Sequence, residues 1–170
     1  ISGWGKPADV ALAAGLGEKG RFTSIFEKGT KAQWKKLGQF LGDRFKGISA
    51  KGMEVDLEET DLLFIDTEHT AETLHPLLMK HHGKVRKYIV VHCTDTYGKT
   101  GDRSDASGNV KPGVMPALAL FMSKHMGWVV IRHNTNNHGL MVLSRCEEDR
   151  KALPGWFKQA GNFLTAMTKH

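Results

Sequence analysis

The sequence predicts a single α/β domain over residues 1–170, with a mostly parallel β-sheet, helices on both faces of the sheet and an antiparallel hairpin near its C-terminal end. Three observations support this prediction. The chain has 170 residues, 40% of them hydrophobic, which suits one substantial core. Short apolar runs alternate with segments of helical periodicity, as in parallel strands joined by crossover helices. Two later apolar runs are separated by a short turn, which favours antiparallel pairing.

The N-terminal part of the chain is predicted to alternate between helices and strands. Apolar side chains recur at helical spacing over residues 7–16 and 30–41, and a glycine follows each segment. Residues 21–26 and 45–49 are the strand candidates of this part. A glycine-containing segment at residues 2–5 has almost no strand in front of it, so we expect that an upstream segment is missing.

The middle of the chain contains the two clearest strand candidates. Residues 61–66 form an apolar run between two carboxylates, which is typical of a strand covered on both faces. A helix is predicted over residues 70–82, and a second buried strand over residues 87–92. Residues 93–112 are rich in Gly, Asp, Ser and Thr, so a long loop is predicted at the C-terminal end of that strand.

The C-terminal part is predicted to supply the antiparallel hairpin. A helix is expected over residues 113–125, followed by strands at 128–133 and 140–144 on either side of a turn at 134–139. Apolar and aromatic residues then fall on one side of a final helix over residues 154–168.

Composition narrows the classes of partner and compartment. The net charge of +6 comes from scattered lysines and arginines, a pattern typical of solvated helix faces, with an anionic-ligand surface as the alternative. No aromatic-and-basic motif supports nucleic-acid binding. No apolar run reaches the roughly 20 residues that cross a membrane, and no leader is recognisable, so a cytoplasmic protein without a membrane partner is expected. Cys93 and Cys146 lack metal-ligand spacing, so neither a disulfide framework nor a structural zinc site is indicated.

Three stretches carry a family resemblance. They read Leu-Leu-Phe-Ile-Asp-Thr-Glu-His-Thr at residues 62–70, Val-Arg-Lys-Tyr-Ile-Val-Val-His at 85–92 and Asn-Asn-His-Gly-Leu at 136–140. These stretches resemble the cephalosporin-hydroxylase and macrocin O-methyltransferase group of class I S-adenosylmethionine-dependent methyltransferases. The resemblance runs from about Gly3 to Arg145, and it implies a Rossmann-like methyltransferase fold.

The resemblance also implies a binding site for S-adenosylmethionine. Gly3 and Gly5 would let the backbone approach the cofactor closely. Glu27 would accept hydrogen bonds from the ribose hydroxyls. Asp66 ends a buried strand and would face the same crevice.

A small-molecule hydroxyl is the acceptor that the resemblance implies. His69 or His92 would remove its proton. A divalent cation such as magnesium would be held by Asp66 and Asp95, because hard cations prefer carboxylates. The residues alone also allow structural roles, in which Asp66 caps the following helix and Cys93 is a small buried substitute for an aspartate. Cys93 as a nucleophile or a soft metal ligand is the alternative. The sequence leaves the oligomeric state open, including a homo-oligomer.

Four positions depart from the pattern of that family, namely Pro7, Phe26, Lys51 and Cys93. All four fall where ligand contacts are expected, and Cys93 stands where the family has an aspartate. A second hypothesis therefore remains open: a non-catalytic binding or assembly protein with the methyltransferase fold that has lost its ligand or changed to an anionic one.

Overall fold

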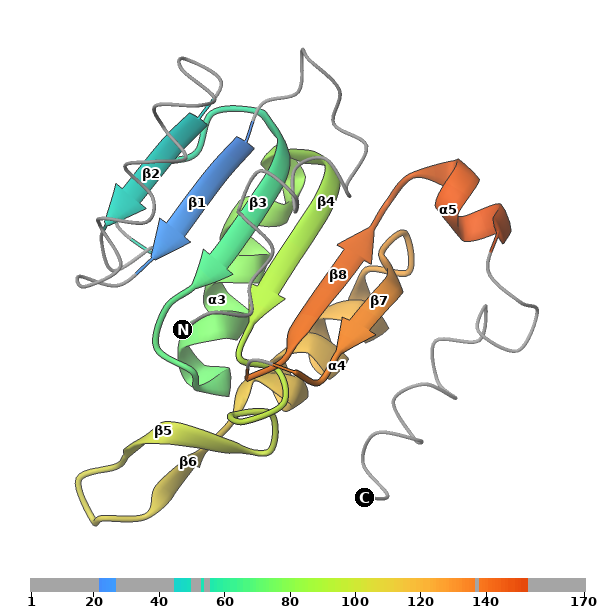
Figure 1. Cartoon of the computed structure of the whole chain (residues 1–170). Coiled ribbons are helices and arrows are strands. Elements are labelled where there is room, and N and C mark those ends of the chain that lie inside the picture. Colours follow the sequence, from blue (N-terminus) through green and yellow to red (C-terminus); the bar gives the residue numbers. More distant parts are fainter. Residues whose placement is uncertain (1–21, 27–44, 50–52, 54–55, 137, 153–170) are drawn as a thin grey trace.

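A six-stranded sheet forms the centre of the molecule (Figure 1). The computed structural model describes residues 22–26, 45–49, 53, 56–136 and 138–152. The strands of the sheet lie in the order β2-β1-β3-β4-β8-β7. Their bounds are Phe22–Phe26 for β1, Phe45–Ser49 for β2, Thr60–Asp66 for β3, Val85–His92 for β4, Val129–Asn134 for β7 and Leu140–Ser144 for β8.

The pairing of these strands confirms the predicted fold class. Strands β2, β1, β3 and β4 pair in parallel, whereas β8 pairs antiparallel with both β4 and β7. The sheet is therefore mostly parallel and is completed by an antiparallel hairpin. Each of the six strands was predicted to within two residues at either end.

Several predictions concern residues outside the described ranges. They are the helices expected over residues 7–16, 30–41 and 154–168, and the site residues Gly3, Gly5 and Glu27. The departures Pro7 and Lys51 also lie outside them.

Strand β3 is buried on both faces, as its unbroken apolar sequence predicts. Leu62 and Leu63 are both fully buried, although neighbouring side chains of a strand point to opposite faces. Leu63 and Ile65 belong to the main hydrophobic core, which also includes Ile89 and Val91 of β4. The buried strands β3 and β4 therefore position the residues at their C-terminal ends.

Two helices, α3 (Ala71–His81) and α4 (Val114–Lys124), pack side by side on one face of the sheet (Figure 1). Helix α3 begins after Thr70, whose hydroxyl oxygen accepts a hydrogen bond from the backbone N–H of Thr73 at 3.2 Å. Thr70 is thus the N-cap of α3, the role considered for Asp66. Side chains three and four residues apart face the core, namely Leu74, Leu77 and Leu78 in α3 and Ala117, Leu118 and Phe121 in α4.

None of the helices in the described ranges is long and apolar enough to span a membrane.

A histidine pair joins the C-terminal ends of α3 and α4. The rings of His82 and His125 have centroids 4.1 Å apart, and His82 also lies against Phe121. Burial and the neighbouring charges of His125 and Arg145 lower the pKa of His82 below its usual value. Because the unfolded chain then binds the proton more tightly, the stability that this pair provides is present above pH ~6.5 and is lost as the pH falls below that value.

We therefore compare the change in the urea midpoint of unfolding when the pH is lowered from 7.5 to 5.5, and expect it to be less favourable to the folded state in the wild type than in a His82→Gln variant. The variant removes the group whose protonation is costly in the folded state. His138→Asn is the control, because His138 is exposed and asparagine tolerates its positive φ of 69°. The same pH-dependent change of the midpoint in wild type and His82→Gln would contradict this account.

The predicted loop over residues 93–112 is wrong in part, because it contains a hairpin. Strands β5 (Thr100–Ser104) and β6 (Val110–Pro112) pair antiparallel and project from the sheet edge (Figure 1). Asp105 closes the turn by accepting hydrogen bonds from the backbone N–H groups of Ser107 and Asn109. Most of the hairpin is exposed, so its strands lack the hydrophobic alternation that would have indicated them. The short helix α5 (Glu147–Ala152), with no buried residue, was also not predicted.

Candidate active site

The order of the strands creates a crossover point between β1 and β3. The chain places β2 on one side of β1 and then returns to place β3 on the other side. In open α/β sheets, ligands bind in the crevice beyond the C-terminal strand ends at such a point. Phe26, the last residue of β1, pairs there with Asp66, the last residue of β3.

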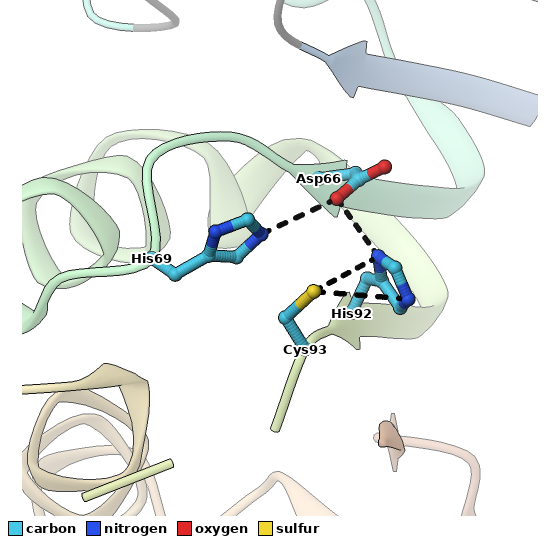
Figure 2. A group of neighbouring side chains, drawn as sticks. All are labelled: Asp66, His69, His92 and Cys93. Atoms are coloured by element: carbon cyan, nitrogen blue, oxygen red, sulfur yellow. Dashed lines mark hydrogen bonds and ion pairs between the residues drawn. The ribbon is translucent and has the colours of Figure 1, made fainter. Parts of the chain in front are cut away.

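Four polar side chains meet at this edge, and we call them the edge cluster: Asp66, His69, His92 and Cys93 (Figure 2). An Asp66 carboxylate oxygen lies 2.9 Å from Nδ1 of His92 and 3.5 Å from Nε2 of His69. Sγ of Cys93 lies 3.4 Å from Nδ1 of His92. One donor atom from each residue falls within 4.8 Å of all the others. Three predicted site residues thus lie together. Cys93 joins them, although its spacing along the chain did not indicate a metal site.

The sheet explains why residues so far apart in sequence meet. Strands β3 and β4 are adjacent and parallel, so they end at the same edge, with Ile65 paired to Val91. Asp66 and His92 are the next residues along these strands. Cys93 follows with a φ of 60°, which is uncommon for a residue other than glycine. This left-handed residue begins the turn in which the N–H of Tyr97 donates to the carbonyl of Cys93.

Asp102, on β5, fixes the position of His69. One carboxylate oxygen of Asp102 accepts a hydrogen bond from the backbone N–H of His69 at 3.0 Å, and the other lies 2.9 Å from ring Nδ1. The ring of Tyr97 stacks on the His69 ring with centroids 4.8 Å apart. The projecting hairpin therefore supports the site, a role that its polar sequence did not indicate.

The charges of the edge cluster stabilise one another. Burial alone would raise the pKa of Asp66, but the ion pair with His69, the hydrogen bond with His92 and the positive charges of both rings hold it well below its usual range. Burial would lower the pKa of both histidines, but Asp66 and Cys93 outweigh it and raise the pKa to about 11 for His69, where Asp102 also contributes, and to about 9 for His92. The same histidines lower the pKa of Cys93 against the effect of burial. Without a ligand, the site therefore holds a carboxylate and two imidazolium groups at neutral pH.

Asp95, the second metal ligand expected from the resemblance, lies outside the edge cluster. It is exposed, and its backbone N–H donates to the carbonyl of His138 in the β7–β8 turn. Gly139 packs so closely on it that an added Cβ would lie 2.6 Å from the Asp95 Cβ. With a single carboxylate beside two imidazoles and a thiol, the edge cluster does not fit magnesium, which prefers an all-oxygen octahedral shell.

No protein-family model and no curated protein matches this sequence. Solved structures do match. Magnesium protoporphyrin IX methyltransferase (ChlM) from Synechocystis PCC 6803, with bound S-adenosylhomocysteine, superimposes with a TM-score of 0.52 at 8% identity, over 82% of this chain and 80% of that one. The MycE methyltransferase of the mycinamycin pathway, in complex with Mg, S-adenosylhomocysteine and mycinamycin VI, gives a TM-score of 0.50 at 11% identity, over 88% of this chain.

At 8% and 11% identity, these similarities show the fold alone. The chain spans about half the length of MycE, since the match covers 51% of that protein. The finer resemblance to the cephalosporin-hydroxylase and macrocin O-methyltransferase group stays a prediction. The strand order, the parallel pairing and the solved neighbours together show that this chain has the Rossmann-like fold of class I methyltransferases.

Proposed function

We propose that this protein transfers a methyl group from S-adenosylmethionine to a hydroxyl group of a small molecule. The observation that carries the proposal is the gathering of Asp66, His69 and His92 at the crossover edge of a methyltransferase fold. ChlM and MycE support the cofactor, because both were solved with S-adenosylhomocysteine, the product that methyl transfer leaves. MycE supports a small-molecule acceptor, because its structure also contains mycinamycin VI.

The cofactor would occupy the crevice beyond β1 and β3. We propose that Gly3 and Gly5 give the backbone close approach to the cofactor and that Glu27, directly after β1, binds the ribose. With the neighbouring imidazoles neutral, the carboxylate of Asp66 would attract the positively charged sulfonium group into the same crevice.

The reaction needs little beyond two well-placed substrates and a proton acceptor. The acceptor oxygen attacks the methyl carbon, the new C–O bond forms as the C–S bond breaks, and S-adenosylhomocysteine leaves. A ring nitrogen of His69 or His92 takes the hydroxyl proton. Beside Asp66 and Cys93 alone, both rings are positively charged imidazolium groups. A neighbouring sulfonium charge lowers the pKa of a histidine and favours the neutral ring, which can accept the hydroxyl proton.

A methyl-transfer assay with isotopically labelled S-adenosylmethionine and a panel of hydroxylated small molecules tests the proposal. We expect labelled product with at least one acceptor, and a loss of about 10²–10⁴-fold in rate when the base is removed by His69→Gln or His92→Gln. His125→Gln is the matched control, because His125 follows α4 and lies against His82 rather than in the edge cluster. Wild-type rates in both edge-cluster variants would show that neither histidine is the base.

A further inference from the structure

We propose that the edge cluster binds a single zinc ion. It offers one carboxylate oxygen, two imidazole nitrogens and one sulfur, with all four donor atoms within 4.8 Å of one another. A tetrahedral zinc ion has bonds of about 2.0–2.3 Å, which place its ligand atoms roughly 3.3–3.7 Å apart. The separations of 2.9, 3.4 and 3.5 Å within the cluster already approach those values. The other donor pairs lie within 4.8 Å, so side-chain shifts of up to about 1 Å would complete the shell.

The donor types select zinc over magnesium. Thiolate and imidazole are the ligands of borderline and soft ions, whereas magnesium is bound by oxygen and water. The charges also match, because a carboxylate and a thiolate balance the two charges of the ion while both imidazoles bind as neutral ligands. Of the described residues, these four are the group whose donors lie close enough together to hold an ion.

His69 is already oriented as a metal ligand. The Asp102 carboxylate holds ring Nδ1 at 2.9 Å, which leaves Nε2 directed at the other members of the cluster (Figure 2). Nε2 is buried and has no hydrogen-bond partner, since Asp66 is 3.5 Å away. A carboxylate behind the ring is the usual support of a zinc-bound histidine, because it fixes the tautomer and the orientation of the ring.

Cys93 supplies the donor that distinguishes this site. Its sulfur lies on the side of His92 and Asp66 (Figure 2), and its backbone adopts the left-handed conformation, which costs free energy for a residue with a Cβ. A buried thiol in this conformation, beside two histidines and a carboxylate, favours a role as a metal ligand over a role as a space-filling replacement for an aspartate.

Zinc binding would also regulate the proposed reaction, and this consequence rests on the proposed function. Four protein ligands fill a tetrahedral shell and leave no position for a substrate oxygen. The ion would occupy both histidines, so one equivalent of zinc is expected to stop methyl transfer and a chelator to restore it. Binding of the metal is measured without cofactor or acceptor, so the zinc site and the methyltransferase activity succeed or fail separately.

The test is calorimetric titration of the metal-free, untagged protein with zinc chloride and, separately, with magnesium chloride. We expect one zinc ion per chain with a dissociation constant below about 1 µM, and no magnesium binding to the cluster. Cys93→Ser should weaken zinc binding by about 100-fold or more, and Asp102→Asn by about 10–100-fold. Cys146→Ser is the matched control, because the other cysteine lies outside the cluster.

Cobalt substitution gives a second readout that does not depend on affinity. The wild-type protein loaded with Co²⁺ should show a thiolate-to-cobalt charge-transfer band and the visible bands of tetrahedral cobalt. Cys93→Ser should lose the first band, and Cys146→Ser should keep both. Absence of stoichiometric zinc binding to the folded wild-type protein, or a charge-transfer band that survives Cys93→Ser, would overturn the proposal.

Discussion

An Asp66→Asn variant is expected to lose methyl transfer by at least about 100-fold, because the amide carries no charge to attract the sulfonium group or to orient the two histidines. The variant should remain folded. Without the carboxylate, the pKa values of His69 and His92 fall, so the rings lose their protons instead of leaving two unpaired buried charges. The measurement is the rate of labelled methyl transfer, together with the affinity for S-adenosylhomocysteine and a circular dichroism spectrum.

The control for this variant lies at the other end of the same strand. Asp61 is 7% exposed and receives two hydrogen bonds from Arg86, at 3.0 and 2.9 Å. Asp61→Asn removes the same charge from β3, so it should cost stability while activity stays near the wild-type value. Equal losses of activity in the two variants would mean that Asp66 acts through the fold. Unchanged ligand affinity and rate in a folded Asp66→Asn protein would remove Asp66 from the site.

A Phe121→Ala variant should lose about 3–5 kcal/mol of its free energy of unfolding, the usual cost of emptying a large buried aromatic site. Phe121 is fully buried on α4, and its ring contacts those of His82, His125 and Trp128. A small domain has only about 5–15 kcal/mol in total, so the variant should unfold at a much lower urea concentration.

Leu120→Ala is the matched comparison for Phe121→Ala. Leu120 is the preceding residue of the same helix and is 44% exposed, so truncating it leaves no cavity. We expect its urea midpoint to stay close to that of the wild type. A similar small effect of both substitutions would contradict the placement of α4 against the sheet.

The sequence was most informative where burial was complete. The apolar runs before Asp66 and His92 have no polar residue to interrupt them, so two buried parallel strands were predicted. Residues at the C-terminal ends of such strands meet at one edge of the sheet, which is why Asp66, His69 and His92 could be selected as site residues. The strand candidate at residues 45–49 also agrees with β2.

Contacts between site residues that are far apart in the sequence could not be predicted from the sequence. Asp102 and His69 are 33 positions apart, and the hairpin that joins them is polar and exposed, without a periodic signal. Cys93 was judged by its spacing along the chain, although two of its partners in the cluster, Asp66 and His69, lie at and just after the end of a different strand, β3. Asp95 follows His92 closely in sequence, but the left-handed turn at Cys93 leads it towards His138 instead.

Calorimetric titration of the wild-type protein with S-adenosylmethionine and S-adenosylhomocysteine is the most direct test of the proposed function. The account predicts that both bind one site per chain with dissociation constants in the micromolar range, and that Asp66→Asn weakens this binding. Absence of binding by the folded protein, in the presence and in the absence of zinc, would contradict the proposed function. The methyltransferase fold would then serve as a non-catalytic scaffold or as the site of a different, anionic ligand.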